Sequence, residues 1–98
     1  MNIRIDEALR LLTNWKNQET SLQVHLSRSG VREDFRGTIR NVEGSVIEFL
    51  DQHKKVQVDV QGADFNGDES SPGYLVCEFA NADRYSFYVL RGNVNSFP

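Results

Sequence analysis

The sequence predicts a mainly β domain in which an N-terminal α-helix is followed by five or six antiparallel strands that curl into a small barrel. Three observations lead to this prediction. One early segment has the apolar spacing of a helix, later segments alternate apolar and polar residues as strands do, and their connections are short. Short antiparallel connections favour a closed or nearly closed barrel, because closure removes exposed strand edges.

The composition indicates one soluble domain. We expect residues 1–98 to form it, because 98 residues suffice for a single modest core. The net charge is -3, and residues 56–98 carry 2 basic and 6 acidic residues. This balance excludes a protein that holds nucleic acid by bulk charge. The start has no small-residue cleavage site, and no apolar run approaches about 20 residues, so we expect a cytoplasmic protein without a membrane partner.

Residues 5–17 form the predicted helix. The apolar residues that recur on one helical face are Ile5, Ala8, Leu9, Leu12 and Trp15. Asp6 near the start and Lys16 near the end complement the helix dipole. Leu11 lies off this stripe and is either a surface residue or a contact with another chain. We expect the helix to lie across one open end or face of the sheet, with Trp15 as its largest anchor.

The segment 34–51 is predicted to form the central hairpin. Its first strand alternates apolar with polar residues through Phe35, Gly37 and Ile39. Val42 is out of phase with this pattern, which predicts a bulge or sharp bend just before the glycine turn. The second strand is apolar on both faces, as in a central strand. A strand that carries glycine and then bends is typical of small sheets that curl into barrels.

Four other segments have strand patterns. Residues 20–28 and 56–61 alternate cleanly, and their inward residues are expected to be Leu22, Val24, Leu26, Val56, Val58 and Val60. Residues 74–80 and 84–91 form a last hairpin that is apolar on both faces, so it is either central in the sheet or half covered by another molecule.

Polar and glycine-rich segments connect these strands. Ser29-Gly30 opens a turn that continues through Glu33, and residues 52–55 form a hairpin tip. Residues 63–65 are expected to form a bent or helical turn, and residues 66–73 the only loop of any length. We expect the tail, residues 93–98, to fray.

No pattern indicates catalysis, a cofactor or a metal. Cys77, the single cysteine, lies in an apolar strand and is expected to be a buried hydrophobe. Asp64, Asn66 and Asp68 have the spacing that begins a calcium loop, but Leu75 stands where the bidentate glutamate would be. The two histidines lie in separate predicted elements. We therefore predict that the protein is not an enzyme.

The order of a short helix before strongly bent strands, over roughly residues 5–65, resembles the Sm-like small β-barrel family. Residues 35–42 look like the family's second strand, and residues 60–64 look like its short turn after the fourth strand. The resemblance implies assembly into rings through strand edges and binding of short single-stranded RNA around the pore. The turn after residue 42 lacks the family's asparagine, and Gln61 replaces a basic residue, so the base-binding residues mostly do not carry over.

Basic residues around the first two hairpins are the candidate phosphate contacts. Arg36 and Arg40 point outward from one strand, Arg28 lies at the preceding turn, and Lys54 lies at another hairpin tip. Acidic neighbours make a solvated face of mixed charge the alternative. We predict a non-catalytic interaction module that self-associates through strand edges and the last hairpin. Binding of single-stranded RNA is the more specific form of this prediction. The alternative is a structural or regulatory subunit that binds protein and no nucleic acid.

Overall fold

A computed structural model of the chain describes residues 1–51, 54–68, 70 and 72–90. The elements are β1 (Asn2–Ile3), α1 (Ile5–Asn17), β2 (Leu22–Arg28), β3 (Val31–Glu43), β4 (Val46–Asp51), β5 (Lys54–Asp59), β6 (Asp64–Gly67), β7 (Tyr74–Glu78) and β8 (Arg84–Val89). All eight strands belong to one sheet in the order β1-β6-β7-β8-β2-β3-β4-β5, and every neighbouring pair is antiparallel. The prediction of a mainly β domain with an N-terminal helix is confirmed.

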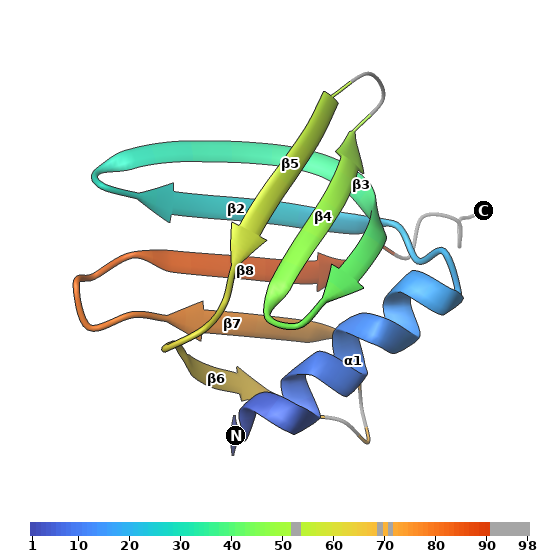
Figure 1. Cartoon of the computed structure of the whole chain (residues 1–98), viewed down its shortest axis with the longest axis horizontal. Coiled ribbons are helices and arrows are strands. Elements are labelled where there is room, and N and C mark those ends of the chain that lie inside the picture. The colour runs from blue at the N-terminus through green and yellow to red at the C-terminus, as the bar shows by residue number, and fades with distance from the viewer. Residues whose placement is uncertain (52–53, 69, 71, 91–98) are drawn as a thin grey trace.

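The sheet is open rather than closed into the predicted barrel. Its two ends are β1 and β5, which do not pair with each other in the described part of the chain. The long strand β3 instead folds the sheet into two layers (Figure 1). The first half of β3 pairs with β2 and the second half with β4. The second half of β3, β4 and β5 therefore lie over the layer that contains the first half of β3, β2, β8, β7 and β6.

The bend in β3 arises at two neighbouring positions. Gly37 is the last residue of β3 that pairs with β2, opposite Leu22. A Cβ at Gly37 would lie 2.4 Å from the backbone oxygen of Leu50 on β4, so only glycine allows the two strands to approach this closely. The β3–β4 register then shifts between Ile39 and Asn41, which confirms the predicted bulge.

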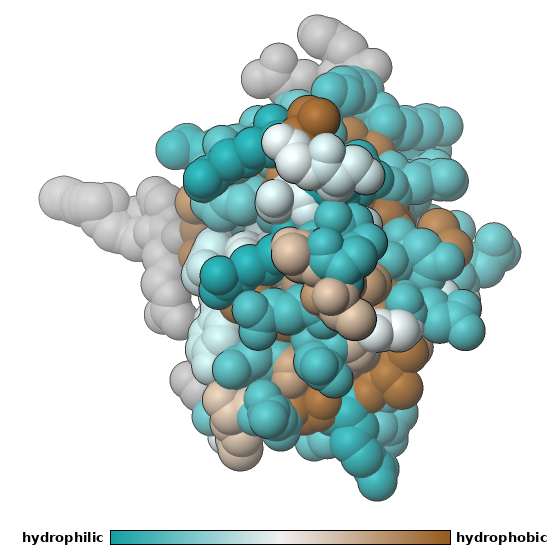
Figure 2. Space-filling view, turned by 90° about the vertical axis from the view of Figure 1, so that its left-hand side faces the viewer, coloured by the Kyte–Doolittle hydropathy of each residue, from teal (hydrophilic) through white to brown (hydrophobic). Residues whose placement is uncertain are grey.

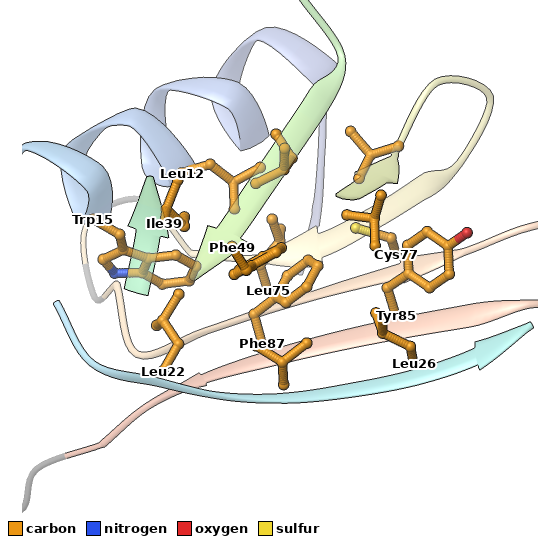
Figure 3. Packing of buried hydrophobic residues seen from close by; sticks show 14 of the residues in the cluster. Leu12, Trp15, Leu22, Leu26, Ile39, Phe49, Leu75, Cys77, Tyr85 and Phe87 are labelled. Carbon is orange, nitrogen blue, oxygen red and sulfur yellow. The ribbon is translucent and has the colours of Figure 1, made fainter. Parts of the chain in front are cut away.

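The hydrophobic core lies between the two layers. Phe49 of β4 stacks on Phe87 of β8 with 5.3 Å between ring centroids, and it meets Phe35 of β3 edge-on at 5.8 Å. The helix closes one end of this core, because α1 contacts β3 and β6 and directs Leu12 and Trp15 inward (Figure 3). The six inward residues predicted for the strand segments 20–28 and 56–61 are all buried.

The helix bounds are confirmed, but the prediction for Leu11 is wrong. Leu11 is 1% exposed, whereas Ile5, which was placed on the apolar stripe, is 41% exposed. The buried face of α1 consists of Ala8, Leu11, Leu12 and Trp15. The helix contacts two strands, β3 and β6, so its buried face is wider than the single stripe of residues predicted from the sequence.

Two short strands were not predicted. Residues 63–65 and 66–73 were assigned to a turn and a loop, yet Asp64–Gly67 forms β6 and pairs with both β7 and β1. The first hairpin has a tight two-residue turn at Ser29-Gly30, so residues 31–33 belong to β3 and not to the turn. The last hairpin, β7–β8, lies inside the sheet between β6 and β2, which resolves the choice between a central and a half-covered position. The tail at residues 93–98 and residues 52–53 of the predicted hairpin tip fall outside the described residues, whereas Lys54 and Lys55 of that tip belong to β5.

Candidate ligand-binding surface

Polar side chains form three rows across the face of β2, β3 and β8 that points away from the core. The strand register places Ser27 between Arg32 and Arg84, His25 between Asp34 and Ser86, and Gln23 between Arg36 and Tyr88. The intervening residues of β2 point inward and are buried. We call this surface the outer face. Each row therefore joins a pair of side chains from the β2–β3 hairpin to a side chain of β8, which is distant in the sequence.

The outer face is hollowed over β2 and β8. The hollow has a volume of about 380 Å³, and its side chains are Arg32, Arg84, Ser27, Ser86, His25 and Tyr88. We call it the arginine hollow. The two arginines belong to one row, and Tyr88 lies two rows further along the strands. The hollow therefore has a cationic end and an aromatic end.

The two arginines keep their terminal nitrogens available. Arg32 donates through Nε to Asp34 Oδ1 at 3.3 Å, and Arg84 Nε lies 3.9 Å from Glu78 Oε2. Among the described residues, their Nη atoms donate no hydrogen bond, and the side chains are 72% and 56% exposed. Each guanidinium is thus oriented by a neighbouring carboxylate and can still donate to a ligand.

A histidine–carboxylate pair forms the middle row. His25 Nδ1 lies 2.6 Å from Asp34 Oδ1. This hydrogen bond, together with that from Arg32, lowers the pKa of Asp34. Because an ionised carboxylate only accepts hydrogen bonds, Nδ1 of His25 carries the proton. The imidazole also meets the ring of Tyr88 edge-on at 5.9 Å, so it supports the aromatic end of the hollow.

Ser86 is the one buried polar residue of the described chain, at 7% exposure. It lies on β8 opposite His25 of β2 and Val76 of β7, and it lines the arginine hollow. Within the described residues its hydroxyl has no side-chain hydrogen-bond partner. Buried hydroxyls usually find a partner, so this one is a candidate contact for a ligand or a water molecule.

The four basic residues predicted to contact phosphate do not gather in one place. Arg36 lies on the outer face and donates through Nε to Gln23 Oε1 at 2.9 Å. Arg40 belongs to the other layer, where its Nε lies 3.8 Å from Glu48 Oε1 of β4. Of the four, only Arg36 belongs to the outer face.

Arg28 and Lys54 bridge the two layers of the sheet. Both contact Glu33, at 3.5 Å and 2.9 Å, and Arg28 Nη1 also donates to the carbonyl of Gln57 on β5 at 3.3 Å. The Lys54 hydrogen bond, helped by Arg28, lowers the pKa of Glu33. These side chains thus tie β5 to the β2–β3 hairpin where no backbone ladder does.

Sequence reasoning missed Arg84, Ser86 and Tyr88 as members of a common surface. Their alternation with buried Tyr85 and Phe87 already places them on one face of a strand. What the sequence does not provide is the pairing of β8 with β2, which brings this face beside that of the first hairpin.

No candidate metal centre is found in the described part of the chain. No group of three or more His, Cys, Asp or Glu side chains there could hold a metal ion. Asn66, part of the calcium-like spacing, lies in β6 and accepts hydrogen bonds from the N-terminal amine at 2.7 Å and from Tyr74 at 3.3 Å. Cys77 is buried, as predicted, and burial raises the pKa of its thiol to about 12.

The end of the molecule that carries the β2–β3 and β7–β8 turns is mostly hydrophilic, and its apolar residues form small separate patches (Figure 2). These two turns are joined by a hydrogen bond from the Ser29 backbone N–H to Asp83 Oδ1 at 3.0 Å. In the residues that the structure describes, no helix has the length and apolarity needed to cross a membrane. Contacts at this end are therefore mainly polar.

No protein-family model, curated protein or solved structure matches this chain. The Sm-like resemblance accordingly stays a prediction.

Proposed function

We propose that the protein is a non-catalytic interaction module that binds single-stranded RNA across its outer face. The observation that carries this proposal is the arginine hollow, whose guanidinium groups and aromatic ring lie at opposite ends of one depression. Guanidinium groups pair with phosphate oxygens, and exposed aromatic rings stack on bases without regard to sequence. Proteins that bind single strands commonly combine both kinds of contact.

The charges on the outer face suit local contacts better than bulk attraction. Asp34 and Glu78 lie beside Arg32 and Arg84, and the whole chain has a net charge of -3. Affinity would therefore come from stacking on Tyr88 and from a few phosphate contacts. With Arg32, Arg84 and Arg36 as three contacts, the affinity for a single strand should fall with salt at a logarithmic slope of about 2.

Fluorescence anisotropy with a labelled decauridine tests this proposal. We expect Tyr88→Ala to weaken binding at least about tenfold, because stacking contributes about 1–3 kcal/mol per base. Tyr88→Phe keeps the ring and is expected to bind like the wild type. Arg36→Gln should weaken binding and lower the salt slope, whereas Lys55→Gln removes the same charge from the exposed strand β5 and should change neither.

Two results would contradict the proposal. One is the absence of decauridine binding at low salt. The other is an affinity that Tyr88→Ala and Arg36→Gln leave unchanged while circular dichroism shows folded variants. Arg40→Gln tests a basic residue that the sequence predicted as a phosphate contact but that lies outside the outer face. Because Arg40 contacts Glu48 on the other layer, this substitution should leave the affinity for decauridine unchanged.

Self-association through β5 is a second candidate, because this strand ends the sheet and has a paired neighbour on one side only in the described chain. In an antiparallel ladder alternate residues direct their backbone groups away from the partner strand. Gln57 of β5 is one of the residues whose backbone groups point away from β4, and its carbonyl accepts a hydrogen bond from Arg28 Nη1. A second copy would have to displace this contact.

The solution mass, measured by light scattering on a sizing column, tests this candidate. A dimer or larger assembly that Gln57→Pro dissociates would support pairing at β5, because this substitution removes an N–H that points away from β4. A monomer would contradict it.

A further inference from the structure

We propose that the arginine hollow binds the terminal phosphate monoester of a nucleic-acid strand rather than a phosphate within the strand. This inference rests on the proposed function, since it requires a strand to lie on the outer face. It specifies that the end of the strand is recognised, and that the group bound in the hollow is a dianion.

The row that contains both arginines fits a dianion. Arg32 of β3 and Arg84 of β8 flank Ser27 of β2, so their Cα atoms are separated by two strand spacings, or about 10 Å. Side chains of this length can converge on one group that lies over Ser27. A terminal phosphate monoester carries close to two negative charges at neutral pH, whereas a phosphate within the strand carries one. Asp34 and Glu78 each lie beside one of these arginines, so the match rests on the Nη donors of the two guanidinium groups. A monoester offers these donors three terminal oxygens, whereas a phosphate within the strand offers two.

The buried hydroxyl of Ser86 supplies a further donor in the hollow. Ser86 is 7% exposed, lines the same depression as the two arginines, and has no side-chain hydrogen-bond partner in the described chain. Phosphate oxygens accept hydrogen bonds from hydroxyl groups. Ser86 lies opposite His25, one row along from the two arginines, so a phosphate placed between the two rows could accept a hydrogen bond from its hydroxyl.

The layout of the hollow also suits a strand end. Arg32 and Arg84 lie at one end, and Tyr88 lies two rows further along the strands. A phosphate within a strand continues into the chain through two ester oxygens, whereas a terminal phosphate continues through only one. From a terminal phosphate between the arginines, the strand would extend toward Tyr88, where the first base would stack.

Isothermal titration calorimetry with three decauridines tests this inference. The three strands carry hydroxyl groups at both ends, a 5′-phosphate, or a 3′-phosphate. We expect one of the phosphorylated strands to bind about tenfold more tightly than the unphosphorylated strand, because charge-assisted hydrogen bonds are among the stronger polar contacts. In Arg84→Gln, and in Arg32→Gln as a second exposed variant, this ratio should fall close to one.

Two further variants separate the phosphate contacts in the hollow from its aromatic end. Ser86→Ala should reduce the ratio, because the substitution removes only the hydroxyl. Tyr88→Ala should weaken all three strands by a similar factor and leave the ratio intact.

Each result bears on a specific proposal. Equal affinity of the three strands for the wild type would overturn the terminal-phosphate inference and leave RNA binding standing. A preference that survives both arginine substitutions would overturn it as well, because the phosphate would then bind elsewhere. Failure of all three strands to bind would overturn the proposed function itself, and the inference with it.

Discussion

The substitution Gly37→Ala tests the origin of the bend that divides the sheet into two layers. A methyl group at this position would lie 2.4 Å from the backbone oxygen of Leu50, and Cβ atoms essentially never come within 3.0 Å of another atom. Because the contact is with backbone, no side-chain rotation relieves it. The strands β3 and β4 must separate at the point where β3 changes its partner from β2 to β4.

We expect Gly37→Ala to lower the free energy of unfolding by about 3 kcal/mol, the upper end of overpacking costs. Fluorescence of the buried Trp15 during urea denaturation measures this loss. The urea midpoint should fall by about 1–3 M, because m for a small domain is about 1–3 kcal/mol/M in urea. Gly44→Ala is the control, since Gly44 has φ +60 with no atom within 4 Å of an added Cβ, and it should cost about 1 kcal/mol. A Gly37→Ala variant no less stable than Gly44→Ala would refute the reasoning.

Three further predictions concern the core and the layer contacts. Leu11→Ala should lower the free energy of unfolding, measured by urea denaturation, by about 2–4 kcal/mol, because Leu11 is 1% exposed. Leu9→Ala should lower it less, because Leu9 is only half-buried, and equal losses would contradict the assigned helix face. Cys77 should resist iodoacetamide at pH 8 until urea unfolds the chain, because a pKa of about 12 leaves about one thiol in ten thousand ionised; rapid native labelling would disprove its burial. The hydrogen bond from Lys54 lowers the pKa of Glu33 in the folded state. Its stabilisation is therefore fully present above the ordinary carboxyl pKa of about 4.3, and it is lost as the pH falls through the lowered pKa of the folded state. The urea midpoint should decline over that range, and Glu33→Gln should make the decline shallower; an unchanged decline would show that the contact does not contribute.

Local patterns in the sequence were sufficient to predict most of the secondary structure. The bounds of α1, the inward residues of β2 and the bulge after Ile39 follow from the spacing of apolar residues within one element. The missed strands β1 and β6 contain two and four residues, too few for a period to be recognised. They exist because they pair with each other and with β7, a non-local interaction.

Closure of the sheet and the position of the basic residues depend on which strands meet. Arg28 is at a turn in the sequence, but its guanidinium reaches β5, where it accompanies Lys54 at Glu33. Arg84 lies in the acidic last third of the chain, yet the pairing of β8 with β2 brings it into the same row as Arg32. No local pattern encodes this pairing. The candidate surface therefore could not be assembled from the sequence.

The most direct test of the proposed binding surface is to map amide chemical shifts in a heteronuclear NMR spectrum during titration with decauridine. We expect concentration-dependent changes along β2, the first half of β3 and β8, centred on Ser27, Ser86 and Tyr88. The amides of β4 and β5 should remain unchanged, since these strands form the other layer. Changes confined to β4 and β5, or a spectrum that decauridine does not alter, would contradict the assignment of the outer face as the ligand-binding surface.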